Sequence, residues 1–317
     1  MASAVSAPRG LRLALSVIVL ASLCLVLVAS PAAPWLLLIV LVLAHAYPGR
    51  RCLHGHEIID LGVPGWFKNH LQDVMWFKWE LVFEHRLLHT GVLDLLDAAL
   101  ARGNGRDVVA LAAGGGGPEP FLIEALRARE NRDLRLLLTD YTPNPERHAK
   151  VAARFGPGWV EHRTDSVDLF ALPDLPTGAT LTLCGAAHHF LPHELARFLD
   201  GAIAKGQPVY VLDARASLRS VLLMPLRAFS FSVAAGLWYS VTQLDLRRLG
   251  TTLTLVGPLV QAYDAFISAL RMYGAADVRA LLAQVDGAQQ YHWDLDGMDG
   301  LGDVSVWAGW PRETDEE

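Results

Sequence analysis

The length, charge and cysteine content of the chain exclude several classes of protein. It has 317 residues, a formal net charge of −6 and a hydrophobic fraction of 52%. An acidic chain lacks the basic surface that nucleic acid requires, so we expect no nucleic-acid partner. Its three cysteines (Cys24, Cys52 and Cys184) are widely spaced. This pattern fits a reducing compartment and excludes a disulfide framework and a cysteine-based zinc site.

Much of the hydrophobic excess lies near the N-terminus. Residues 13–29 form an apolar stretch about long enough to cross a bilayer, and a shorter apolar run follows at 35–46. Basic residues flank the two runs on their outer sides: Arg9, Arg12, Arg50 and Arg51. This charge pattern favours a cytoplasmic position for both flanks. We therefore predict that residues 1–50 anchor the protein in a membrane through one or two transmembrane helices, with the rest facing the cytoplasm.

A cleaved signal peptide is the alternative for this segment. Arg9, the first apolar stretch and the small residues at 28–30 resemble one. Cleavage there would leave the second apolar run unexplained.

The next segment, residues 51–105, is predicted to be a linker followed by an N-terminal helical cap. Its first part is polar and contains glycine and proline. From Trp66 to Ala101 apolar residues recur at spacings of three and four, which predicts helix. A glycine-containing loop at 102–106 ends this region.

From residue 106 to 317 the pattern predicts one α/β domain. Strands are expected at 107–113, 134–139, 159–163, 179–184 and 208–212, and helices from Pro118, at 145–155 and at 192–205. Strands that alternate with helices at this spacing predict a parallel sheet with helices on both faces.

The alternation stops near residue 215. A helical insertion is expected over 215–285, with apolar stretches at 221–240 and 251–273, and it could cover a substrate or rest against a bilayer. Two late strand candidates, 289–293 and 304–308, predict a hairpin.

The chemistry-bearing signal begins with four glycines, Gly114, Gly115, Gly116 and Gly117, directly after the first predicted strand. Asp140 ends the second strand. Glycines let the backbone approach a ligand, and an acid at the next strand end can accept hydrogen bonds from ribose hydroxyls.

This arrangement resembles class I S-adenosylmethionine-dependent methyltransferases, in an uncharacterised bacterial branch. The resemblance extends from about Trp66 to Pro311. Its most specific motifs are Leu-Ala-Ala-Gly-Gly-Gly-Gly-Pro and Gly-Ala-Ala-His-His-Phe. It implies a Rossmann-like sheet of seven strands, the last one antiparallel, and S-adenosylmethionine as cofactor.

The resemblance also implies roles for single residues. The four glycines would pass beside the methionine moiety of the cofactor. Asp140 would hold the ribose hydroxyls, Tyr141 would lie against the adenine, and Asp168 would accept from the adenine amino group. The chain departs from the family at Ala110, where an acid is usual.

His188 and His189 follow the fourth predicted strand, where open α/β sheets place catalytic groups. Either could act as a general base toward a substrate hydroxyl or amine. The alternative is that one of them caps or packs on the next helix.

Two other pairs of histidines have spacings that also occur in metal sites. The pairs are His54 with His56 and His85 with His89, beside Glu57 and Glu84. Membrane di-iron enzymes use more such pairs than these two, so we expect no metal.

These observations predict a membrane-anchored methyltransferase that acts on a small, lipophilic acceptor. A non-catalytic scaffold with the same fold is one alternative, favoured by Ala110. A nicotinamide-dependent oxidoreductase is another, but Pro118 and Glu119 stand where its glycine pattern would end.

Overall fold

The computed structural model describes residues 63–312, apart from 86–87, 131, 157 and 173–174. The chain divides into two compact units, which are described separately. The helical unit contains the described residues before Leu87 together with Ser217–Arg271, and the sheet unit contains Leu88–Ala216 and the residues from Met272 onward. The predicted membrane anchor over residues 1–50 lies outside the described residues.

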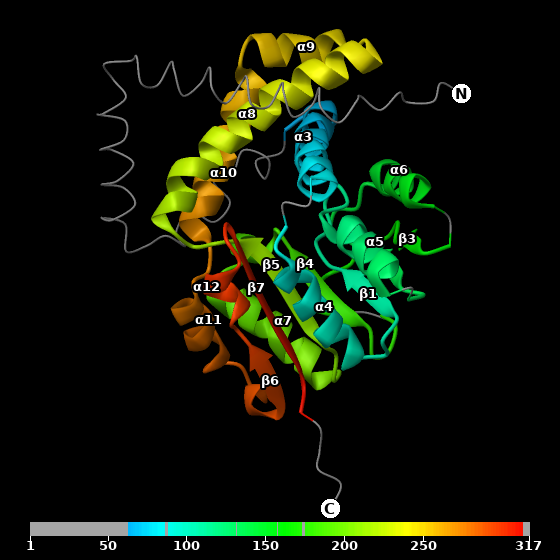
Figure 1. Ribbon diagram of the computed structural model, residues 1–317, viewed down its shortest axis with the longest axis vertical. Helices are drawn as coiled ribbons and strands as arrows, with labels where there is room; N and C mark the ends of the chain where they lie inside the picture. The colour runs from blue at the N-terminus through cyan, green and yellow to red at the C-terminus, as the bar shows by residue number, and fades with distance from the viewer. Residues whose placement is uncertain (1–62, 86–87, 131, 157, 173–174, 313–317) are drawn as a thin grey trace, which may run out of the picture. The chain divides into compact units, whose positions relative to one another are not determined.

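The sheet unit is built on a seven-stranded mixed sheet with the order β3-β2-β1-β4-β5-β7-β6 (Figure 1). The first five strands pair in parallel, and β7 is antiparallel to both β5 and β6. This confirms the predicted seven-stranded α/β sheet with an antiparallel last strand. The strands are β1 Asp107–Ala110, β2 Arg135–Leu138, β3 Val160–His162, β4 Thr180–Cys184, β5 Val209–Ala214, β6 Tyr291–Asp294 and β7 Val304–Pro311.

Helices cover both faces of this sheet. Strand β5 shows why, because successive side chains of a strand point to opposite faces. Val209 and Val211 join the apolar cluster that contains Phe198 and Val278, whereas the Tyr210 hydroxyl donates to the Val92 carbonyl. The helices of this unit are α4 Thr90–Ala101, α5 Glu119–Glu130, α6 Pro145–Phe155, α7 Pro192–Ala204, α11 Ala275–Leu282 and α12 Gly297–Gly300, with 3-10 turns η3 Ala187–His189 and η4 Ala288–Gln290.

Strand β1 is shorter than predicted. It ends at Ala110 instead of continuing to residue 113, because Ala112 adopts a left-handed conformation with φ of 50°. The backbone N–H groups of Leu111 and Ala113 still donate to neighbouring strands. The chain therefore turns out of the sheet just before the glycines.

The helical unit consists of α3 Gly65–Glu84, α8 Leu218–Gln243, α9 Leu246–Leu253 and α10 Val256–Arg271. Apolar side chains of α3 and α8 pack together, with Phe77 and Leu81 against Ala234 and Ala235. The Gln261 side chain of α10 donates to the Leu71 carbonyl of α3 at 3.0 Å. The predicted 215–285 insertion contains these last three helices and α11, which belongs to the sheet unit.

The helix predicted from Trp66 to Ala101 is interrupted. Helix α3 ends at Glu84 and α4 begins at Thr90, where the His89 ring accepts the Gly91 N–H at 3.1 Å. A side-chain acceptor at this position caps a new helix start, which the apolar periodicity alone does not reveal.

Among the described residues, α8 is the one continuous helix whose length and composition would allow it to cross a membrane. Its most apolar 18-residue window has a mean hydropathy of 1.5, and 39% of that window is buried. The α9–α10 pair passes the same test only as a span bent by 66°. Core helices of soluble proteins also pass this test, so it is weak support for a membrane location.

Candidate functional site

The sequence-predicted site residues lie at the carboxyl ends of the parallel strands. The glycine loop follows β1, Asp140 follows β2, and Asp168 lies in the segment after β3. His188 follows β4 in η3. Parallel strands point the same way, so their carboxyl ends share one edge, which is where open α/β sheets bind ligands.

The glycine loop, Gly114 to Gly117, adopts backbone conformations that favour glycine. Gly114, Gly116 and Gly117 have φ values of 53°, 110° and 53°. The Gly114 N–H donates to Asp140 Oδ2 at 2.7 Å, and the Gly116 N–H donates to the Ala113 carbonyl at 2.7 Å. The two features singled out in the sequence are therefore in direct contact.

Helix α6 holds the same loop from its other side. His148 Nε2 lies 2.9 Å from the Gly114 carbonyl, and Arg147 Nε donates to the Gly115 carbonyl at 3.2 Å. Burial lowers the pKa of His148, which keeps its ring neutral, and the carbonyl requires the tautomer that carries hydrogen on Nε2. Sequence analysis missed both residues, because only the fold brings α6 to the loop.

Asp140 is engaged within the protein at both carboxylate oxygens. Besides holding Gly114, it accepts the Thr142 N–H at 2.8 Å through Oδ1. Tyr141 beside it is 67% exposed, as a residue that stacks on a ligand would be. Asp168 is half-buried, and its Oδ1 accepts the Phe170 N–H at 2.9 Å.

Glu119, at the start of α5, is a buried acid that sequence analysis treated only as a departure from a nicotinamide motif. It is 1% exposed, and neither carboxyl oxygen has a hydrogen bond of normal geometry among the described residues. Burial raises its pKa to about 8, and the Cys184 thiol lies beside it. A methyl group on Gly117 would overlap Oε2 of Glu119, so glycine there makes room for the acid.

His188 forms a pair with Asp213 at the end of β5. Its Nδ1 lies 2.8 Å from Asp213 Oδ2, and its backbone N–H donates to the same oxygen at 3.2 Å. Burial acts to raise the pKa of Asp213, but the His188 ring and backbone N–H donors hold it below its usual range. An ionised Asp213 accepts hydrogen from Nδ1, which leaves Nε2 of His188 as the basic nitrogen.

His189 is less tightly held than its neighbour. Its ring is half-buried and lies 4.4 Å from that of His188, centroid to centroid. Neither histidine occupies the N-cap of α7, which is Leu191, its N–H bound by Glu194 Oε2 at 2.7 Å.

Ala110 and His89, which the sequence marked as a departure from the family and as a metal candidate, both have structural positions. Ala110 is fully buried in β1, between Leu138 and Thr182 of the adjacent strands. His89 serves as the cap of α4. The part of the chain that the structure describes contains no group of three or more residues that could hold a metal ion, and His54, His56 and Glu57 lie outside it.

No protein-family model matches the sequence, and no curated protein matches it. Several solved structures to which the chain is similar are S-adenosylmethionine-dependent methyltransferases, the superfamily that the sequence motifs resemble.

Two methyltransferases and one dehydrogenase are examples of the solved structures to which the chain is similar. The mitomycin 7-O-methyltransferase MmcR is 14% identical over 70% of this chain and 53% of its own, with a TM-score of 0.41. The O-methyltransferase NcsB1 from neocarzinostatin biosynthesis, solved with S-adenosyl-L-homocysteine and 1,4-dihydroxy-2-naphthoic acid, is 16% identical over 74% and 56%, with a TM-score of 0.42. A putative Zn-dependent alcohol dehydrogenase from Rhodobacter sphaeroides is 14% identical over 77% and 98%, with a TM-score of 0.42.

The matched parts of MmcR and NcsB1 are only about half of each enzyme.

Proposed function

We propose that this protein is a membrane-anchored, S-adenosylmethionine-dependent methyltransferase that acts on a small, lipophilic acceptor, with its catalytic domain facing the cytoplasm. The observation that carries the proposal is the joining of the glycine loop to Asp140 at the same sheet edge as the His188–Asp213 pair. A nucleoside-binding loop and an oriented base at adjoining strand ends are the parts that such a reaction needs.

The residues at this edge fit the chemical groups of the cofactor. S-adenosylmethionine carries a diol, an amine-bearing ring and a cationic sulfonium, and when bound it supplies an electrophilic methyl group. Asp140 would hold the diol, Asp168 would accept from the adenine amino group, and exposed Tyr141 would lie against the ring. The glycine loop would allow close approach of the methionine part.

Glu119 would supply the acid that is missing at Ala110. Burying a carboxyl group that has no hydrogen bond of normal geometry among the described residues is costly, and a positively charged ligand group would stabilise its ionised form. Glu119 starts α5 directly after the glycine loop, where the cationic end of the cofactor would lie.

His188 would act as the general base. The bond from Nδ1 to Asp213 directs the basic lone pair to Nε2, which would take a proton from an acceptor hydroxyl or amine as that atom bonds to the methyl carbon. The remaining rate enhancement would come from positioning the acceptor and excluding water.

The membrane part of the proposal rests on the sequence and on the exposed surface of the helical unit. Residues 13–29 and 35–46 are apolar, with basic residues on their outer sides. Large apolar side chains are exposed on α9 and its flanks, including Leu244, Leu246 and Leu253. A membrane location favours an acceptor that partitions into lipid.

A non-catalytic scaffold is the second candidate, and two observations favour it. Ala110 replaces the family's acid, and both Asp140 oxygens are occupied by protein groups. Such a scaffold would bind no nucleoside.

Calorimetry of the full chain in detergent, with S-adenosylhomocysteine, S-adenosylmethionine and NADH as titrants, separates these functions. We expect binding of the two sulfur nucleosides only. Asp140→Ala should weaken S-adenosylhomocysteine binding at least tenfold, or about 1.4 kcal/mol. Asp165→Ala, which removes an exposed acid paired with Arg163, is the matched control and should bind normally. Unchanged affinity in Asp140→Ala would overturn the pocket assignment, and binding of NADH alone would support an oxidoreductase.

A further inference from the structure

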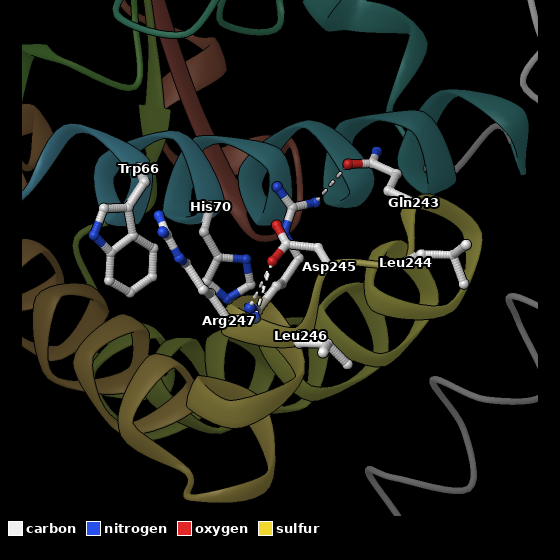
Figure 2. A pocket seen from close by; sticks show the side chains of 8 residues that line it. Trp66, His70, Gln243, Leu244, Asp245, Leu246 and Arg247 are labelled. Atoms are coloured by element: carbon white, nitrogen blue, oxygen red, sulfur yellow. Dashed lines mark hydrogen bonds and ion pairs between the residues drawn. The ribbon is translucent and has the colours of Figure 1, made fainter.

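A cavity of about 530 Å³ lies within the helical unit, between the start of α3 and the turn that joins α8 to α9. Trp66 and His70 line it from α3, and Leu244, Leu246, Arg247 and Arg248 line it from the turn. Figure 2 shows the side chains of Trp66, His70 and Arg247 turned toward the same space. None of these residues belongs to the proposed methyltransferase site.

His70 is an unsatisfied polar group in the wall of this cavity. The residue is fully buried, and both ring nitrogens lack a hydrogen-bond partner among the described residues. Gly257 of α10 leaves room for the ring, because a Cβ at that position would stand 3.1 Å from His70 Nε2. Burial, aided by the Arg248 charge, lowers the pKa of His70 to about 4. The neutral ring therefore carries one donor and one acceptor that no described residue uses.

The charges around the cavity leave one cation without a counter-ion. Arg248 is buried, bonds Asp73 Oδ2 at 2.8 Å and lies 3.7 Å from Asp245 Oδ2. The other oxygen of Asp245 accepts the backbone N–H groups of Arg247 and Arg248. The exposed Arg247 guanidinium has no carboxylate within ion-pair distance in the part of the chain that the structure describes. Both aspartates lie against Arg248, so the four charges sum to zero, and Arg247 is the cation that can contact an anionic ligand directly.

The rim of the cavity is apolar and unusually exposed. Leu244 is 85% exposed and Leu246 is 79% exposed. Leu244 has a φ of 53°, in the left-handed region, which costs a side chain such as leucine about 1–2 kcal/mol relative to glycine. Leu255, in the next turn, is also exposed and has a φ of 61°. Helices α8, α9 and α10 carry four other exposed apolar residues: Val241, Leu253, Val256 and Leu259.

We propose that this pocket binds the phosphodiester headgroup of an anionic membrane phospholipid, with Arg247 contacting the phosphate, His70 lying in the wall behind it and the rim leucines entering the acyl layer. A phosphodiester presents anionic oxygens that can accept two hydrogen bonds from the exposed Arg247 guanidinium. Exposure of these leucines to water is unfavourable, and Leu244 also has a strained backbone. The exposed leucines therefore favour a lipid over free phosphate as the ligand. The inference extends the membrane association of the proposed function but needs neither the N-terminal anchor nor methyl transfer.

The test uses the full chain in a nonionic maltoside detergent, titrated with dihexanoyl phosphatidylglycerol and separately with inorganic phosphate. The detergent supplies apolar chains without phosphate, so heat from the lipid reports on the headgroup. We expect the lipid to bind and inorganic phosphate to bind at least tenfold more weakly. Arg247→Ala should lower lipid affinity at least tenfold, and Leu246→Ser should lower it by a smaller factor. Arg279→Ala, at an exposed arginine of α11, is the control and should bind as the native chain does.

Unchanged lipid affinity in Arg247→Ala would overturn the proposal, and so would equal affinity for inorganic phosphate, which would identify a free-anion site. S-adenosylhomocysteine binding is measured in the same samples and should be unaffected by Arg247→Ala. Its loss in Asp140→Ala with lipid binding retained keeps the two proposals separable. Loss of both ligands in Arg247→Ala would overturn the assignment of Arg247 to a separate site.

Discussion

Polar side chains at the sheet edge and polar side chains at the cavity of the helical unit differ in how they are bonded. At the edge of the sheet, Asp140 and Asp213 are bonded to backbone and ring nitrogens that hold neighbouring segments in position. In the helical unit, His70 has no partner and Arg247 no counter-ion among the described residues. The first pattern fixes the geometry of loops in advance, as a reaction site requires. The second pattern leaves the His70 ring and the Arg247 guanidinium without protein partners among the described residues, as expected of a site that its ligand completes.

The largest effect should come from removing the proposed base. His188→Ala should lower kcat for methyl transfer by at least about 100-fold, because general-base catalysis contributes that much or more. The measurement is release of S-adenosylhomocysteine with a panel of hydroxylated aromatic acceptors.

The control for this variant is His193→Ala, at an exposed histidine of α7. It should retain full activity. Asp213→Asn should fall between the two, since it disturbs the orientation of His188 while keeping the ring. Equal activity of His188→Ala and the native chain would break the contrast drawn for the sheet edge.

Glu119 is a buried acid of the sheet unit whose oxygens lack hydrogen bonds of normal geometry among the described residues, and its effect should be somewhat smaller. Its pKa is about 8 in the folded protein against 4.5 for a solvated glutamate, so the folded state binds more protons between these values. Stability should therefore fall as pH rises from 4.5 to 8, by on the order of 5 kcal/mol at most. Glu119→Gln removes this dependence and should be more stable than the native chain at pH 8.

Urea unfolding at pH 5 and pH 8, followed by circular dichroism, measures the difference. Glu124→Gln, at an exposed position of the same helix, should keep the native pH dependence. Adding S-adenosylmethionine should reduce the loss of stability at pH 8 in the native chain only. A native chain whose stability is flat over this range would show that Glu119 is solvated.

The smallest effect concerns the helical unit and has the opposite sign. Leu244→Gly should raise the free energy of unfolding by about 1 kcal/mol, because glycine adopts the left-handed conformation without strain. It should also weaken phospholipid binding. Leu253→Gly, at an exposed leucine that ends α9 with an ordinary helical backbone, should instead destabilise the unit. A destabilised Leu244→Gly variant would mean that Leu244 packs on something other than lipid.

The sheet was predictable from sequence because its signals are local. Buried runs such as Leu134 to Thr139, separated by helices that start at Pro145 and Pro192, specify alternating strands and helices. The errors fall where a single backbone angle or side-chain bond decides, as at Ala112, which ends β1, and His89, which starts α4.

The site was predictable only in part, for a related reason. Gly114 to Gly117, Asp140 and His188 follow strand ends, so chain order places them at one edge. The partners that hold them come from distant segments. Asp213 lies 25 positions after His188, and His148 lies 34 positions after Gly114. Glu119 gave no signal, because nothing in its neighbours shows that α5 turns it inward.

The path of the chain through the sheet has a consequence for folding. Strand β5 pairs with β7, and Val209 meets Gly309 across 100 positions of sequence that include α8, α9 and α10. During synthesis from the N-terminus, the edge of β5 that pairs with β7 stays unpaired until the whole insertion and β7 have left the ribosome. Closing such a long loop costs conformational entropy, so the β5–β7 pairing should form late in folding.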